Sequence, residues 1–190
     1  MVTLAAPLIG YNRGIIEKTR KGAPIVPESF TVNFSGVSAS GKTMVCMAAA
    51  SVLGPPENLA KWDFSRPGLE RLCEQANDLP LMLDDTEKLV EEGGLKLKSA
   101  ISLVTQCVAG KQSKALAQIA HETTSPQRNW STMGLSSSPI PVDSIAAAGK
   151  WSRSLGERVR FINVCVPLPE VGGVFDEVAV SSGVATASKK

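Results

Sequence analysis

Short apolar runs, separated by glycine, proline and charged residues, predict alternating strands and helices. Phe30, Val32 and Phe34 alternate with polar residues, as in a strand, and the apolar, alanine-rich run 44–53 predicts a buried helix. Further patterns predict helices at 65–77 and 95–108, a short helix or turn at 143–148, and strands at 79–84, 130–138 and 159–166. This alternation predicts an α/β fold, a three-layer sandwich around a mostly parallel sheet.

The strand at 30–34 and the helix at 44–53 enclose a glycine loop. Residues Gly36 to Thr43 read G-x-x-x-x-G-K-T, the pattern of a phosphate-binding P-loop. A loop between a strand and a helix directs several backbone N–H groups and a helix N-terminus at a phosphate. The alternative is a turn of small residues that matches the pattern by chance. The flanking strand and helix favour the nucleotide site.

Each residue type in this loop has a physical role. Gly36 and Gly41 permit backbone angles and a close approach that a Cβ would block. Lys42 can place a cation between the β- and γ-phosphates of ATP, and Thr43 offers a hydroxyl to Mg²⁺. The small residues that leave room for the triphosphate are Ser38, Ala39 and Ser40.

A second element is the apolar run 79–83 that ends in Asp84 and Asp85. In a P-loop ATPase such a strand carries its first acid to the edge beside the loop, where Asp84 would hold Mg²⁺. Asp85 would then polarise the attacking water. Most such ATPases have Glu there, and Asp is one methylene shorter, so either hydrolysis is slowed or Glu87 is the base. The alternative is that residues 84–86 cap a helix starting near Glu87, but their position one crossover after the loop favours the metal site.

Two further candidates lie near the end of the chain. A strand between the acid strand and the last strand commonly ends in a residue that senses the γ-phosphate, and Ser136 or Ser137 fits that role; the alternative is a serine turn. Among Arg153, Arg158 and Arg160, Arg160 is the best candidate for an arginine that acts in trans on the nucleotide of a neighbouring subunit. The alternative is that Arg158 and Arg160 are strand residues that face solvent.

Composition narrows the class of protein. The 190 residues are enough for one compact domain, and 43% hydrophobic with 20% charged residues predicts a folded chain. A net charge of +2 neither demands nor excludes nucleic acid. The lysines at 96, 98, 111 and 114 either line a channel for a nucleic-acid backbone or form a solvated face. The four cysteines form no C-x-x-C pair, which favours a reducing cytoplasm, and no apolar run predicts a signal peptide or a membrane span.

The ordered motifs resemble one known family. In order along the chain they are Ala5-Ala-Pro-Leu8, the glycine loop, Ala48–Gly54, the acid strand 77–85, Gly110-Lys111 with Lys114, the strand 130–137, Gly156–Arg160 and Gly172–Asp176. This set is similar to the domain of unknown function numbered 927, which is found in phage, plasmid and bacterial proteins, is often labelled helicase-like or inactivated helicase, and is frequently fused to or encoded with primase domains. We therefore expect one P-loop ATPase domain at 1–176 and a disordered tail at 177–190.

The resemblance implies a RecA- or AAA-like ATPase that uses ATP and Mg²⁺, forms a homo-oligomeric ring and acts on DNA, with a primase as partner, in replication of a phage, plasmid or other mobile element. Two departures weaken the expectation of efficient hydrolysis: the family usually has Asp-Glu at 84–85, and Ser-Thr-Gly-Glu where residues 136–139 read Ser-Ser-Ser-Pro. The alternative function is a non-catalytic ATP-binding assembly module. A small-molecule kinase is a weaker alternative, and the absence of an N-K-x-D motif disfavours a GTPase.

Overall fold

The computed structural model describes residues 29–57, 59–84, 86, 94–114, 127–171 and 174. Several predictions lie outside these residues: the role of Asp85, the alternative base Glu87, the motif near the N-terminus, both limits of the predicted domain, and the tail at 177–190. The remaining predicted elements fall within the described residues.

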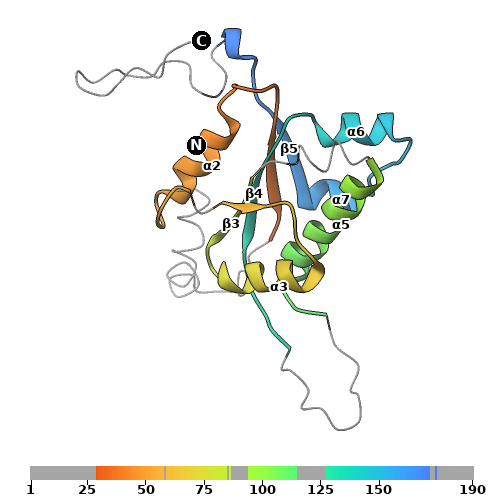
Figure 1. Ribbon diagram of the computed structural model, residues 1–190. Coiled ribbons are helices and arrows are strands. Elements are labelled where there is room, and N and C mark those ends of the chain that lie inside the picture. Colours follow the sequence, from red (N-terminus) through yellow and green to blue (C-terminus); the bar gives the residue numbers. More distant parts are fainter. Residues whose placement is uncertain are drawn as a thin grey trace, which may run out of the picture.

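In this part of the chain five strands form one sheet, and every strand pair is parallel. The strands are β1 (Thr31–Ser35), β2 (Ala60–Lys61), β3 (Pro80–Asp84), β4 (Met133–Ser138) and β5 (Phe161–Cys165), in the spatial order β2-β3-β4-β1-β5 (Figure 1). Because the strands are parallel, their carboxyl ends meet at one edge of the sheet. β1 lies between β4 and β5, so the glycine loop leaves that edge from an interior strand, next to the last strand of the sheet.

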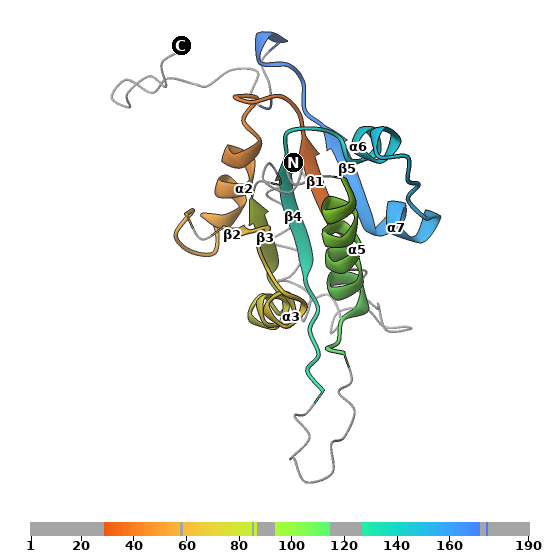
Figure 2. The same ribbon diagram turned by 45° about the vertical axis from the view of Figure 1, so that its right-hand side comes forward.

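Helices cover both faces of the sheet, as expected for an α/β fold. α2 (Lys42–Ala50) lies on one face, and α5 (Gly94–Gly110), α6 (Val142–Ala148) and α7 (Leu155–Arg160) lie on the other (Figure 2). α3 (Arg66–Gln75) packs with α5, and a short 3-10 turn, η1, spans Pro169–Val171. Ser65 caps α3: its hydroxyl accepts a hydrogen bond from the Gly68 N–H. None of the described helices combines the length and the apolar character needed to cross a bilayer.

Strand alternation sorts the core into two layers. Leu81 and Leu83 of β3 point to the α3/α5 face, where they join a cluster that includes Ile101 and Trp62. Met82, between them, points to the α2 face. Successive side chains of a strand alternate between faces, so Asp84 shares the α2 face with Met82. The α2 face is also the face on which the glycine loop continues into its helix.

The polar positions of β1 are buried as well as the apolar ones. Val32 and Phe34 pack against α2, whereas the intervening side chain of Asn33 is fully buried on the opposite face. The Asn33 Nδ2 donates to Ser138 Oγ at 2.8 Å and to Asn163 Oδ1 at 2.8 Å. These hydrogen bonds link β4, β1 and β5 through their side chains. They also give the buried amide of Asn33 the partners that a buried polar group needs.

Three elements differ from the sequence-based prediction. α2 is buried on one side only, and Met44 is 57% exposed on the other. β4 begins at Met133 rather than at Trp130. The last strand begins at Phe161, because residues 155–160 form α7. The Ser154 hydroxyl accepts a hydrogen bond from the Glu157 N–H at 3.1 Å and so caps the N-terminus of this helix. The helix includes residues 159 and 160, which were predicted to belong to the strand.

Candidate functional site

The glycine loop connects the end of β1 to α2 in a tight curve. Gly36 is packed closely: a Cβ there would lie 3.3 Å from the Cβ of Val166. Gly41 is the N-cap of α2 and has a φ of 89°, a left-handed conformation that glycine adopts without strain. α2 has no side-chain cap and no acidic residue in its first turn. The partial positive charge of this helix N-terminus is therefore directed into the loop.

The polar side chains of the loop turn inward. Ser40 Oγ donates to the Val37 carbonyl at 2.8 Å, and the Lys42 ammonium donates to the same carbonyl at 2.6 Å. Lys42 Nζ also lies 3.4 Å from Ser40 Oγ. The lysine cation thus lies over the loop that the helix N-terminus faces, which is the arrangement that attracts a phosphate.

One carboxylate joins this loop to two strands. Asp84, at the end of β3, is 7% exposed. Its Oδ1 accepts hydrogen bonds from Thr43 Oγ1 at 3.2 Å and from Ser137 Oγ at 3.0 Å. Its Oδ2 is 3.1 Å from the ammonium of Lys61, at the end of β2. The structure therefore brings together Thr43, Asp84 and Ser137, which are far apart in the sequence.

The chemistry of these donors fits Mg²⁺. Thr43 Oγ1 and Ser137 Oγ, both hard oxygen donors, each lie within hydrogen-bond distance of Asp84 Oδ1. Mg²⁺ in nucleotide sites is held by one or two carboxylates together with hydroxyls, water and the phosphates of the substrate. A single buried carboxylate beside a threonine at a helix N-terminus meets that description. Thr43 and Asp84 are the residues that could hold the metal.

An open pocket lies between the loop and the end of β4. Its volume is about 320 Å³, within the range typical of small-molecule sites. The residues that line it are Ser38, Ala39, Gly41, Lys42, Thr43 and Met44 on the loop side and Ser137, Ser138 and Pro139 on the strand side. The pocket therefore includes most of the residues that the sequence singles out for nucleotide binding.

The two candidate serines of β4 point to opposite faces of the sheet. Ser137 faces Asp84 and the loop, on the α2 side. Ser136 Oγ accepts a hydrogen bond from the indole Nε1–H of Trp62 at 3.0 Å, and both side chains are buried on the α3/α5 side. The structure thus places Ser137 at the pocket and Ser136 in the core.

The three arginines occupy different environments. Arg153 has a side chain only 2% exposed, forms ion pairs with Asp143 and Glu157, and holds α6 to α7. Arg158 and Arg160 face solvent, but from a helix rather than from the predicted strand. Arg160 directly precedes Phe161, which is in register with the first residue of β1. Arg160 therefore lies at the edge of the sheet opposite the loop, about 13–16 Å away along the strand.

The four lysines proposed to line one channel do not gather in one place. Lys96 and Lys98 lie near the start of α5, and Lys111 and Lys114 follow its end. At about 1.5 Å per residue, the helix separates the two pairs by roughly 20 Å. Lys111 and Lys114 lie on either side of Gln112, which forms an antiparallel bridge with Asn129. A short stretch of a nucleic-acid backbone could therefore contact one of the two lysine pairs but not both.

A buried thiol lies behind the site. Cys46 of α2 is fully buried, and burial, with a smaller effect from the charge of Asp84, raises its pKa to about 12. The thiol is protonated at neutral pH, so it acts as a small apolar side chain that lets α2 approach the sheet.

Sequence reasoning did not identify Lys61 as part of the site. β2 is only two residues long, and nothing in the local sequence distinguishes Lys61 from other exposed lysines. Its position follows from the register of β2 and β3, in which Lys61 is paired with Asp84. Only the three-dimensional structure reveals this neighbour.

Comparison with known proteins gives a family match and one structural similarity. Residues 3–123 match the model of the family "Domain of unknown function (DUF927)". A search of curated proteins finds no match. A solved structure described as "SCCmec type IV Cch - active helicase" is similar over 86% of this chain and 27% of that chain, with 21% sequence identity and a TM-score of 0.49. This chain thus spans about a quarter of that protein. Because the family model covers more than half of the residues, the chain belongs to the DUF927 family.

Proposed function

We propose that the chain is a helicase-like P-loop ATPase domain that binds ATP with Mg²⁺ and hydrolyses it slowly. One observation carries the proposal: Thr43 at the start of α2, Asp84 at the end of β3 and Ser137 at the end of β4 meet at the mouth of the glycine loop. A turn of small residues that matched the loop pattern by chance would not require a buried carboxylate and a second hydroxyl at the same point. The parallel sheet and the pocket support the same interpretation.

Each residue has a defined task in this proposal. The backbone N–H groups of the loop and the Lys42 ammonium bind the β- and γ-phosphates. Thr43 and Asp84 hold Mg²⁺, which neutralises charge on the phosphate oxygens when it is bound. Ser137, which lines the pocket, fixes the orientation of the Asp84 carboxylate and would sense the γ-phosphate. Asp85, next in sequence, orients the attacking water.

Oligomer formation and DNA are part of the proposal. Arg160 lies at the edge of the sheet opposite its own loop, so it can act only on the nucleotide of a neighbouring chain. A homo-oligomeric ring provides such a neighbour. The family resemblance suggests DNA as the polymer on which the ring acts, a primase as partner, and replication of a phage, plasmid or other mobile element as the process.

The test is ATP turnover with Mg²⁺, measured with and without single-stranded DNA. We expect slow turnover that rises with DNA and is abolished by Lys42→Ala. Lys150→Ala is the matched control, because Lys150 is exposed in the turn between α6 and α7. Turnover that is the same in the Lys42→Ala variant would come from a contaminant and would refute the assignment of the site.

The sequence also motivates a second function, a non-catalytic ATP-binding assembly module. The shorter Asp85 in place of Glu is the observation that favours it. Asp85→Glu separates the two functions. If this variant restores strong turnover, the chain is an ATPase whose hydrolysis is weakened by the shorter side chain of Asp85. If ATP binds tightly but neither form turns it over, and the nucleotide changes the oligomer mass, the chain is the assembly module.

A further inference from the structure

Lys61 neutralises the carboxylate to which we assign the metal. Its Nζ is 3.1 Å from Asp84 Oδ2, while Thr43 and Ser137 occupy the other oxygen, Oδ1. The hydroxyl donors are neutral, whereas Lys61 brings a positive charge that offsets the charge of this buried group. The pair is asymmetric: the side chain of Lys61 is 68% exposed and that of Asp84 is 10% exposed.

The backbone of Lys61 is held in place although its side chain is not. Lys61 and Asp84 are register partners in the parallel pair of β2 and β3, so their side chains leave the sheet next to each other. The next residue, Trp62, is 4% exposed and is anchored by its indole N–H on Ser136. The ammonium therefore starts from a fixed point at the site, yet its four-carbon stem can swing into solvent.

A metal ion at Asp84 and the Lys61 ammonium repel each other. A cation held by Asp84 would share this small carboxylate with the Lys61 ammonium, which contacts its Oδ2. Lys42, at the loop, adds a second positive charge on the same face. Binding of the metal alone is therefore opposed by both lysines. A triphosphate, which carries several negative charges, reverses that balance when it enters the loop.

We propose that Lys61 is a positioning residue, a tethered counter-ion of Asp84 that competes with the divalent metal, so that the site takes up Mg²⁺ only together with a nucleoside triphosphate. This inference rests on the proposed nucleotide site. Lys61 occupies Asp84 Oδ2 while the pocket lacks metal and releases it when the metal and the nucleotide arrive together. The buried carboxylate is thereby paired in both states, with Lys61 in the first and with the metal in the second.

The test compares metal affinity in wild type and Lys61→Met, a neutral side chain of similar length. Mn²⁺ alone, followed by electron paramagnetic resonance, is the first probe. We expect Lys61→Met to bind Mn²⁺ about two- to five-fold more tightly than wild type, the size of effect typical of a solvent-exposed ion pair. The second probe is a fluorescent ATP analogue titrated with Mg²⁺, for which the half-saturating Mg²⁺ concentration should fall by a similar factor.

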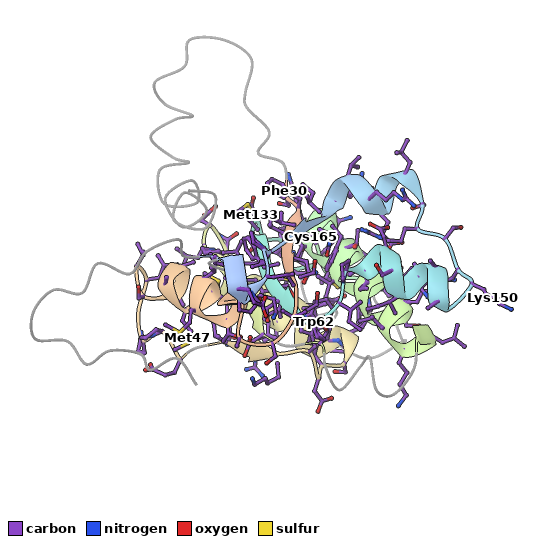
Figure 3. All side chains as sticks on the ribbon, turned by 90° about the horizontal axis from the view of Figure 1, so that it is seen from above. Phe30, Met47, Trp62, Met133, Lys150 and Cys165 are labelled. Atoms are coloured by element: carbon purple, nitrogen blue, oxygen red, sulfur yellow. The ribbon has the colours of Figure 1, made fainter. Side chains whose placement is uncertain are left out.

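Three control variants make the result specific. Lys61→Arg keeps the charge and should behave as wild type. Lys150→Met removes a lysine that Figure 3 shows on the opposite side of the molecule from Met47 of α2, and it should change nothing. In an Asp84→Asn background, Lys61→Met should have no further effect, because Lys61 acts through that carboxylate.

The outcomes separate this inference from the proposed function. Equal or weaker Mn²⁺ binding by Lys61→Met, compared with wild type, would overturn the role of Lys61. An effect of Lys61→Met that persists in the Asp84→Asn background would also overturn it. If the nucleotide analogue binds wild type and Lys42→Ala equally, the proposed function fails, and the Mn²⁺ comparison still decides whether Lys61 competes for the carboxylate.

Discussion

Adjacent serines of β4 provide a matched pair of substitutions with opposite consequences. Ser137 donates to the Asp84 carboxylate at 3.0 Å, and Ser136 accepts the Trp62 indole N–H at 3.0 Å. The two positions share the same strand and the same burial, and alanine removes one hydroxyl in each case. We predict that Ser137→Ala impairs the site and that Ser136→Ala impairs only the core.

The magnitudes follow from the partners. Ser136→Ala leaves a buried donor on Trp62 without an acceptor, which costs about 1–3 kcal/mol of unfolding free energy. Ser137→Ala removes a hydrogen bond to a charged group, which is worth about 1.5–3 kcal/mol. Asp84 keeps Thr43 and Lys61 as partners, so part of that loss is recovered. If Ser137 holds Asp84 in the geometry that catalysis needs, turnover should fall at least about tenfold, which corresponds to 1.4 kcal/mol.

The assays are urea unfolding and ATP turnover at saturating Mg²⁺, with turnover corrected for the folded fraction. Ser136→Ala should unfold at lower urea and keep turnover within about twofold of wild type. Ser137→Ala should lose turnover even where it is fully folded. If Ser136→Ala reduced turnover per folded molecule as much as Ser137→Ala does, the assignment of the two faces to core and site would be wrong.

Four further predictions concern packing, titration, thiol exposure and the neighbouring subunit. Gly134→Ala would place a Cβ against Thr31 Oγ1 and 2.8 Å from its Cγ2, so urea unfolding should show a loss of about 1–3 kcal/mol; unchanged stability would mean that β1 and β4 are less tightly packed. Burial raises the pKa of the Cys46 thiol from 9.0 to about 12, so the stability that the protonated thiol contributes is complete below pH 9 and is lost as the pH rises toward 12. Between these pH values the unfolding free energy of wild type, relative to that of Cys46→Ala, should fall by about 1.4 kcal/mol per pH unit. A difference in unfolding free energy that stays constant with pH would argue against burial of the thiol. Under native conditions at pH 8 a thiol reagent should label exposed Cys165 and spare Cys46, as mass mapping would reveal. Arg160→Ala should retain ATP binding but lose turnover in the oligomer, and unimpaired turnover would exclude Arg160 as the residue acting in trans.

The glycine loop could be predicted from the sequence because its determinants are local. A strand pattern, two glycines, a lysine and an apolar helix lie within about twenty consecutive residues, and β1 and α2 form there. The contact between Thr43 and Asp84 was also foreseeable, because parallel strands deliver their carboxyl ends to one edge.

Features that depend on strand phase or on distant neighbours were not predictable. Choosing between Ser136 and Ser137 requires knowing which of them points to the face of β4 that meets α2. A run of serines has no alternation of apolar and polar residues from which the buried face of each position could be predicted. Lys61 lies on a two-residue strand, too short for alternation to be recognised. The start of β5 was placed too early, although Ser154 and Glu157 form the S-x-x-E signature of a helix N-terminus.

The most direct test of the proposed site is calorimetric titration of ATP with Mg²⁺ into wild type, Lys42→Ala and Lys150→Ala. Removing a charged donor from a phosphate costs about 1.5–3 kcal/mol, so the proposal predicts that Lys42→Ala binds ATP at least about tenfold more weakly than wild type. Lys150→Ala should match wild type. Equal ATP affinity in all three proteins, or no binding by wild type, would contradict the assignment of the glycine loop as a nucleotide site.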